Sequence, residues 1–223
     1  MTWEGVLFIL AKIVPGILTD SEEEYHQRLL IAEHAADLIQ IDVVDGIFSK
    51  NTTVGVDIIK KYPSSSSLEI QLMTAFPQNY INDLASLDYV TRIIFPFETN
   101  TDVNMSIYLI KGYGKQAGLS LNPTTPIEAA YHFFDDVDFL LLMTGDPGYS
   151  GQKLGENTYK RIGQVKKMVR ELPVEIDIGV NFDNAQKLAQ AGADFLVASS
   201  ALYNAPDFKF AYDKLAKLAS FNS

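Results

Sequence analysis

Two aspartates placed at the ends of apolar, strand-like runs are the residues of this sequence best suited to chemistry. Side chains alternate along a strand, so Asp42 shares a face with Gln40, and Asp177 shares a face with Glu175. If these strands are parallel, their carboxyl ends meet at one edge, where two acids can serve as a general acid and a general base. The alternative for each acid is a helix cap or an ion pair. Two acids at matching depth favour the functional interpretation.

A glycine-rich loop follows a third apolar run, residues 137–143. Residues 144–152 read Thr-Gly-Asp-Pro-Gly-Tyr-Ser-Gly-Gln. Glycine permits positive φ angles, which let backbone N–H groups converge on an anion. A loop at the carboxyl end of a strand is also where α/β proteins place their ligands. The loop therefore predicts a ligand site, with an ordinary surface turn as the alternative.

The elements that would position these residues alternate regularly between strand and helix. Most successive strand ends lie 21–29 residues apart, as in parallel βαβ units. Strands are expected near residues 11–18, 38–44, 68–73, 89–95, 117–121, 137–143, 174–178 and 195–198. Helices are expected near 21–35, 56–61, 78–85, 103–113, 126–133, 158–170, 184–191 and 207–219. Eight such units predict a single (β/α)8 TIM barrel domain over residues 1–223. The alternative is a doubly wound open sheet, but the chain lacks a clear dinucleotide-binding glycine fingerprint.

Composition restricts the classes of partner. The 223 residues fit one domain, and a net charge of −10 argues against nucleic-acid and anionic membrane surfaces. The apolar run of residues 6–18 contains Lys12 and is too short to span a bilayer, so we expect a buried strand region there. The absence of cysteine excludes disulfides and thiolate metal sites. We expect a cytoplasmic protein with a small-molecule substrate, no nucleic-acid or membrane partner, and a homo-oligomer as an open alternative.

Several short motifs, taken together and in order, resemble the ribulose-phosphate 3-epimerase family. The loop at residues 143–152 is similar to the family's Met-Thr-x-x-Pro-Gly-Phe-x-Gly-Gln. Residues 40–48 are similar to its His-Val-Asp-Val-Met-Asp-Gly-x-Phe, and residues 69–73 to its Asp-Val-His-Leu-Met. Further matches are Val14-Pro15-Gly16-Ile17-Leu18, residues 121–126, residues 176–181, and residues 191–203. The resemblance extends from about residue 13 to residue 203.

The resemblance implies a TIM barrel that epimerises carbon 3 of a ketose phosphate such as ribulose 5-phosphate. Asp42 and Asp177 take the positions of the two acids that carry protons to and from carbon 3. The substrate and its phosphate would contact residues at the strand ends, which are Met73, Met143, Gly148, Tyr149, Ser150, Gly151, Gly179, Ser199 and Ser200.

The family's metal site is altered in this chain. The family holds a divalent ion with two histidines and two aspartates, and Gln40 and Gln71 stand at the histidine positions beside Asp42 and Asp177. A divalent metal (Mg²⁺, Mn²⁺ or Zn²⁺) is therefore doubtful. An all-oxygen set would suit Mg²⁺, Mn²⁺ or Ca²⁺ better than Zn²⁺. Without a metal, two nearby carboxyl groups would share one proton.

Other histidines do not replace the missing ligands, because His26, His34 and His132 all fall in helical stretches. No organic cofactor is expected. Besides an active epimerase, the sequence leaves open a sugar-phosphate-binding barrel that has lost catalysis. A decarboxylase or aldolase of the related barrels would need an Asp-x-Lys-x-x-Asp motif, and Val44 stands at its lysine position. Ser150, Ile178 and Ser199 replace family glycines and could reshape the phosphate pocket.

Overall fold

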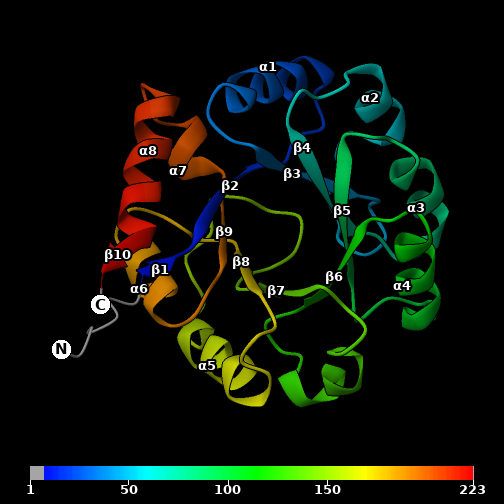
Figure 1. The fold of residues 1–223 in the computed structure, drawn as a ribbon. Helices are drawn as coiled ribbons and strands as arrows, with labels where there is room; N and C mark the ends of the chain where they lie inside the picture. Colours follow the sequence, from blue (N-terminus) through cyan, green and yellow to red (C-terminus); the bar gives the residue numbers. More distant parts are fainter. Residues whose placement is uncertain (1–7, 223) are drawn as a thin grey trace.

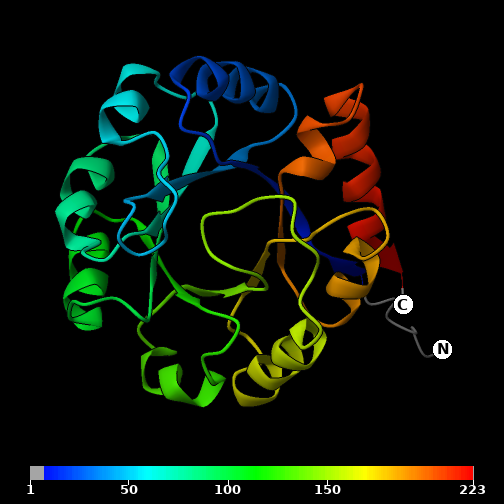
Figure 2. The same cartoon turned by 180° about the vertical axis from the view of Figure 1, so that it is seen from behind.

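The computed structural model describes residues 8–222, and its centre is a closed barrel of eight parallel strands (Figures 1 and 2). Each strand pairs with the next along the chain, and β9 pairs with β2 to close the barrel. The strands are β2 (Lys12–Ile17), β3 (Leu38–Val44), β4 (Ser67–Met73), β5 (Val90–Pro96), β6 (Gln116–Leu121), β7 (Phe139–Met143), β8 (Val174–Asp177) and β9 (Phe195–Ala198). The predicted TIM barrel is confirmed.

Helices surround the barrel in the predicted order (Figure 1). They are α1 (Glu22–Glu33), α2 (Val56–Lys61), α3 (Gln78–Ala85), α4 (Val103–Gly112), η1 (Ile127–Phe133), α5 (Thr158–Met168), α6 (Ala185–Gln190), α7 (Ser200–Tyr203) and α8 (Phe208–Ala219). Ser21, Asp102 and Asp207 cap α1, α4 and α8 by accepting a backbone N–H of the first turn. The segment after Pro126 is a 3₁₀ helix, and the short helix α7 was not predicted.

The strand region expected over residues 6–18 consists of two strands in the described part of the chain. Val6 and Leu7 lie outside the described residues, and the rest divides at Ala11 into two strands of different sheets. β1 (Phe8–Leu10) pairs antiparallel with β10 (Ser220–Asn222), next to the barrel strand β2. This small sheet joins the two ends of the described chain, a pairing that local sequence patterns cannot reveal.

The apolar core has two layers. The larger layer fills the space between the barrel and its helices. The smaller one fills the barrel itself, and its buried members are Val44, Met73, Ile94, Phe139, Leu141, Met143 and Ile178. Gly118 on β6 makes room for the largest of them, because a Cβ there would lie 2.4 Å from the Phe139 ring.

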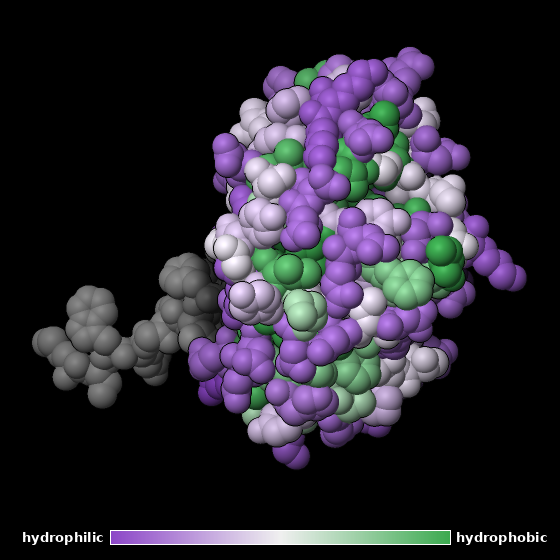
Figure 3. All heavy atoms as spheres, turned by 90° about the vertical axis from the view of Figure 1, so that its right-hand side faces the viewer, coloured by the Kyte–Doolittle hydropathy of each residue, from purple (hydrophilic) through white to green (hydrophobic). Residues whose placement is uncertain are grey.

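Parallel pairing fixes which polar residues are neighbours inside the barrel. Asp42 on β3 pairs with Gln71 on β4, and Asp177 on β8 pairs with Met143 on β7. On the outside of the molecule, the face over α3 and α4 mixes hydrophilic and hydrophobic side chains (Figure 3). Within residues 8–222, no helix has the length and apolar character needed to cross a membrane.

Candidate active site

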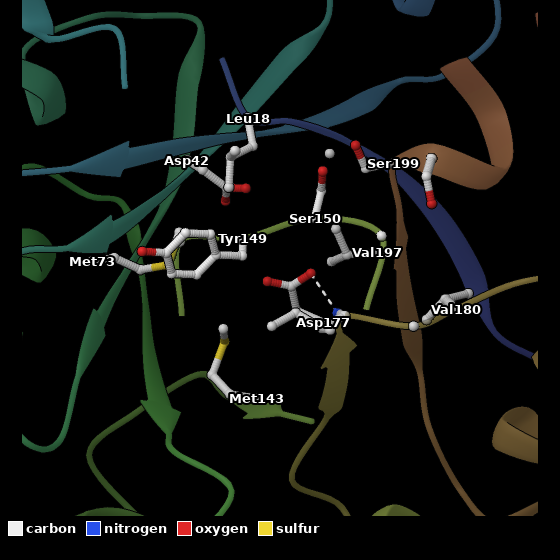
Figure 4. A pocket seen from close by; sticks show the side chains of 16 residues that line it. Leu18, Asp42, Met73, Met143, Tyr149, Ser150, Asp177, Val180, Val197 and Ser199 are labelled. Atoms are coloured by element: carbon white, nitrogen blue, oxygen red, sulfur yellow. Dashed lines mark hydrogen bonds between the residues drawn. The ribbon is translucent and has the colours of Figure 1, made fainter. Parts of the chain in front are cut away.

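A cavity opens among the carboxyl ends of the barrel strands (Figure 4). Its volume is about 470 Å³, including the part open to solvent. All eleven residues predicted from the sequence to act on or bind the substrate line it. They are Asp42, Met73, Met143, Gly148, Tyr149, Ser150, Gly151, Asp177, Gly179, Ser199 and Ser200. The barrel thus brings together residues that are up to 158 positions apart in the sequence (42 to 200).

The two acids enter the cavity from separate strands. Asp42 comes from β3 and Asp177 from β8, and the strands β9 and β2 lie between them in the barrel. Both carboxyl groups face the cavity in Figure 4. Their side chains are almost fully buried, with residue exposures of 6% for Asp42 and 8% for Asp177. Each acid therefore faces the cavity while remaining largely shielded from bulk water.

Burial favours the protonated form of these acids. Burial raises the pKa of Asp42 well above its usual range, and the charge of Asp177 raises it further. Burial also raises the pKa of Asp177, to about 7, although the Ile178 N–H that donates to Asp177 Oδ1 at 2.7 Å opposes the shift. Two carboxyl groups that lie close together and are shielded from water tend to share one proton, which leaves one acid and one base.

Two buried amides connect the acids. Gln40 Nε2 donates to Asp42 Oδ1 at 2.8 Å and to Gln71 Oε1 at 2.8 Å. In this orientation the Gln71 nitrogen lies 3.0 Å from Met143 Sδ. Turning the Gln71 amide by half a turn instead places its nitrogen 3.0 Å from Asp177 Oδ2 and 2.9 Å from Asp42 Oδ1. Either way, Gln71 contacts both acids.

These residues do not fit a divalent metal as they stand. Gln40 directs an amide N–H at Asp42, and an amide nitrogen that carries its hydrogens is not a metal ligand. Asp42 Oδ1 accepts this hydrogen bond and is therefore engaged by an amide donor. No cluster of three or more histidine, cysteine, aspartate or glutamate side chains suited to a metal occurs within residues 8–222. The amides serve as partners of the acids in this arrangement.

The phosphate end of the cavity is built from backbone and hydroxyl groups. Gly148 and Gly179 have φ angles of 85° and 77°. A Cβ on Gly179 would lie 2.4 Å from the backbone nitrogen of Leu154, so only glycine lets these loops approach so closely. Ser150, Ser199 and Ser200 add hydroxyl groups. None of the described lining residues is a lysine, arginine or histidine, so an anion here depends on N–H and O–H donors.

The loop of residues 144–157 crosses the centre of the barrel in Figure 2. Two residues of the β3–α2 loop hold it there. Ser49 Oγ donates to the Pro147 carbonyl at 2.8 Å, and Asn51 Nδ2 donates to the Gly148 carbonyl at 2.7 Å. Within the loop, Gln152 accepts from the Asp146 N–H at 2.9 Å and donates to the Asp146 and Tyr149 carbonyls at 2.8 Å.

Sequence reasoning missed Leu18, Val180 and Val197 in the apolar wall of the cavity; the fourth residue of this wall, Ile178, was named only as one that could reshape the phosphate pocket. Ile178 is also strained, because a β-branched residue at φ 78° is rare. Its carbonyl accepts from Thr144 Oγ1 at 2.7 Å, which helps to hold the strained peptide. The only sequence signal of this strain was that Ile178 stands at a position where the resembling family has glycine.

The histidines lie away from the cavity, as predicted. His26 on α1 stacks on Tyr62 with ring centroids 4.2 Å apart, and His34 at the end of α1 lies 2.6 Å from the Leu30 carbonyl. His132 packs against Phe133 on η1. None of the three lines the cavity.

Comparison with known proteins agrees with this geometry. The profile of the ribulose-phosphate 3 epimerase family matches residues 12–203. The ribulose-phosphate 3-epimerase of Bacillus subtilis is 35% identical over 214 residues, covering 92% of this chain and 98% of that protein. The enzyme of the same name from Serratia marcescens is 33% identical and covers 88% of this chain and 97% of that protein.

Solved structures with low identity share the fold. The 3-hexulose-6-phosphate synthase of Salmonella typhimurium has a TM-score of 0.67 at 17% identity and covers 93% of this chain and 98% of its own. A tryptophan synthase α-subunit from Pyrococcus furiosus has a TM-score of 0.69 at 17% identity, covering 95% of this chain and 99% of its own. These two similarities concern the barrel alone.

Proposed function

We propose that this protein, which belongs to the ribulose-phosphate 3-epimerase family, inverts carbon 3 of a ketose phosphate such as ribulose 5-phosphate. The chain is an enzyme of the isomerase class, and its family supports action on a pentose phosphate. The observation that carries the finer proposal is the pair of buried acids, Asp42 and Asp177, facing one cavity beside a loop suited to an anion. A protein that only binds a sugar phosphate has no need for both acids.

The phosphate would bind at the three strand ends that carry small residues. Backbone N–H groups around Gly148 and Gly179, with the hydroxyls of Ser199 and Ser200, offer donors to its oxygens. The sugar would extend from there toward the acids, between Met73 and Met143, which line the cavity.

The chemistry needs one ionised and one protonated carboxyl group. The ionised acid removes the proton from carbon 3. The electron pair of that C–H bond forms the double bond between carbons 2 and 3, and the carbonyl oxygen takes up the negative charge. The other acid then delivers its proton to the opposite face of carbon 3, and the carbonyl re-forms. The pair holds one proton before and after the reaction, on opposite partners.

The test is incubation with ribulose 5-phosphate in deuterium oxide, followed by proton NMR. We expect the carbon-3 epimer to appear with deuterium at carbon 3. Calorimetry on the same sample measures binding of the sugar phosphate. Tight binding without epimerisation or exchange would contradict the proposal and favour the alternative, a sugar-phosphate-binding barrel that has lost catalysis.

A further inference from the structure

We propose that Gln40 and Gln71 form a hydrogen-bonded chain between Asp42 and Asp177 that reverses its direction when the shared proton changes sides, so that the acid pair works without a divalent ion. This inference rests on the proposed function. It assigns a positioning role to two buried amides at the positions where the family has its metal-binding histidines.

The chain has three contacts, all buried. Asp42 Oδ1 lies 2.8 Å from Gln40 Nε2. Gln40 Nε2 lies 2.8 Å from one atom of the Gln71 amide, which is Oε1 in the first orientation and the nitrogen when the amide is turned. That same Gln71 atom lies 3.0 Å from Asp177 Oδ2. The glutamines are 0% and 1% exposed, so water does not compete for these contacts. Every contact is short enough for a hydrogen bond.

In the first arrangement Asp42 is ionised and Asp177 carries the proton. Gln40 donates one N–H to Asp42 and the other to the Gln71 oxygen. The protonated Asp177 donates its O–H to that same oxygen across 3.0 Å. All three contacts are then hydrogen bonds with a donor and an acceptor.

In the second arrangement both amides are turned by half a turn, and the proton is on Asp42. Asp42 donates its O–H to the Gln40 oxygen. Gln71 donates one N–H to the Gln40 oxygen and one to the ionised Asp177. The number of hydrogen bonds is again three, and the same heavy-atom positions are used.

Two contacts favour the second arrangement. The same Gln71 amide atom lies 2.9 Å from Asp42 Oδ1. In the first arrangement this atom is an oxygen, so two acceptor oxygens repel each other. In the second arrangement it is a nitrogen, and the repulsion is removed. The Ile178 N–H that donates to Asp177 Oδ1 at 2.7 Å favours the same state, because it stabilises an ionised Asp177. In that arrangement Asp177 is the base and Asp42 is the acid.

This reversible chain matches what epimerisation demands. Each turnover moves the proton from one acid to the other, so both proton positions must be supported. A fixed donor would stabilise only one of the two ionised acids. An amide can present either N–H or C=O at the same place, and two amides in series can serve either acid. A cation would instead require both amide oxygens to be directed at it at once, whereas in either arrangement one of the two amides directs an N–H at an acid.

The experiment compares the full-length native protein with two single variants. Gln40→Met and Gln71→Met keep the side-chain length and remove every hydrogen-bonding group. We expect kcat to fall about a hundredfold in each, with KM for ribulose 5-phosphate little changed, because general acid–base catalysis is impaired while phosphate binding is not. Ser120→Ala, which removes a buried hydroxyl on β6 that does not line the cavity, is the matched control and should keep the native rate.

Metal dependence is measured in parallel. The native protein should contain no stoichiometric metal by elemental analysis, and its rate and melting temperature should be the same in EDTA. The double variant Gln40→His, Gln71→His should bind Zn²⁺ by calorimetry and gain a zinc-dependent melting temperature. If Gln71→Met does not fold, Gln71→Asn keeps the amide, shortens the side chain by one methylene and should lose a similar factor in kcat.

The outcomes separate the two proposals. A native rate abolished by EDTA and restored by Mg²⁺, Mn²⁺ or Zn²⁺ would overturn the inference and leave the proposed function standing. Native rates in both methionine variants would also overturn it. Absence of turnover and of carbon-3 exchange in the native protein, with or without metal, would overturn the proposed function and the inference with it.

Discussion

Arg92 places its Nη2 2.7 Å from Glu175 Oε2, in the layer of the barrel directly beneath Asp177. The same guanidinium puts its Nε 2.7 Å from Glu69 Oε2, two residues before Gln71 on β4. It also lies over the Phe139 ring, 3.7 Å from the centroid. One cation thus connects the two strands that carry Gln71 and Asp177, and it does so with almost no exposure to solvent.

This layer holds two buried carboxyl groups, those of Glu69 and Glu175, and one cation, Arg92. Burial raises the pKa of Glu69 well above its usual range, and the charge of Glu175 raises it further, while Arg92 opposes both effects. Removing Arg92 would leave two buried carboxyl groups with no cation among the described residues. The ion pairs of Arg92 therefore hold strands β4 and β8 together beneath the acids. They do so against the unfavourable free energy of burying charged groups.

We predict that Arg92→Met lowers the free energy of unfolding by about 3–5 kcal/mol, the usual effect of breaking a buried ion pair. Urea unfolding followed by circular dichroism measures it. Lys111→Met is the matched control, because the Lys111–Asp138 pair spans 3.6 Å with side chains 42% and 33% exposed. The control should cost less than about 1 kcal/mol. Adding Glu69→Gln to Arg92→Met should recover part of the loss. Equal effects of the two single variants would contradict a buried, tightly coupled layer.

We predict that Asp177→Asn abolishes exchange of the carbon-3 proton with deuterium oxide and stabilises the fold above pH 7. An amide can neither accept nor return the proton. The pKa of Asp177 is raised to about 7 in the folded protein, above its value near 4 in the unfolded chain. Its contribution to stability is therefore present below about pH 4 and is lost as the pH rises through about 7. Because asparagine does not ionise, the Asp177→Asn variant does not lose this stability as the pH rises.

The measurement is urea unfolding between pH 4 and pH 8. The native protein should lose stability as the pH rises across this window, and Asp177→Asn should lose less. Asp135→Asn, at an exposed position after η1, is the control and should follow the native curve with full exchange. Full carbon-3 exchange in Asp177→Asn would remove Asp177 from the mechanism.

The barrel, the two acids and the glycine-rich loop were predictable because their signals are local, whereas the rest of the predicted cavity lining, including Ser200, came from the resemblance to a family. Apolar runs such as residues 38–44, followed by glycine-rich or acidic loops, mark strands whose carboxyl ends must meet in a barrel. Once the barrel was inferred, residues as distant as Asp42 and Ser200 had to share one mouth. Periodicity also located the helix after Pro126, but it does not distinguish 3₁₀ from α hydrogen bonding in so short a segment.

The remaining features depend on contacts between distant parts of the chain. Arg92 is in a predicted strand, but only the closed barrel reveals that it lies between Glu69 and Glu175. The pairing of β1 with β10 joins the two ends of the described chain. The positive φ of Ile178 and the contacts of Gln71 with both acids are also set by neighbours from other strands. No local pattern encodes these contacts.

We predict that Ser200→Glu weakens binding of ribulose 5-phosphate and of inorganic phosphate by at least about tenfold. A carboxylate at the mouth would repel the phosphate, and no cationic side chain among the described lining residues offsets it. Isothermal calorimetry at constant ionic strength measures the change. Gln190→Glu adds the same charge at an exposed position on α6 and should bind as the native protein does. Unchanged affinity in Ser200→Glu would place the phosphate elsewhere.

We predict that Gln152→Ala raises KM for the sugar phosphate several-fold, with a smaller effect on kcat. The Gln152 amide makes three hydrogen bonds that hold the turn from Asp146 to Tyr149, and this turn positions Gly148 and Ser150 at the cavity. Without those bonds the loop must be ordered by the ligand, which lowers affinity by the free energy of ordering. Because Asp42 and Asp177 sit on barrel strands, the proton-transfer step should be less affected.

Steady-state kinetics at saturating and limiting substrate separates the two parameters. Gln116→Ala, at an exposed position at the start of β6, is the matched control and should retain both values. A loss confined to kcat would instead mean that the loop acts on the acids themselves rather than on binding.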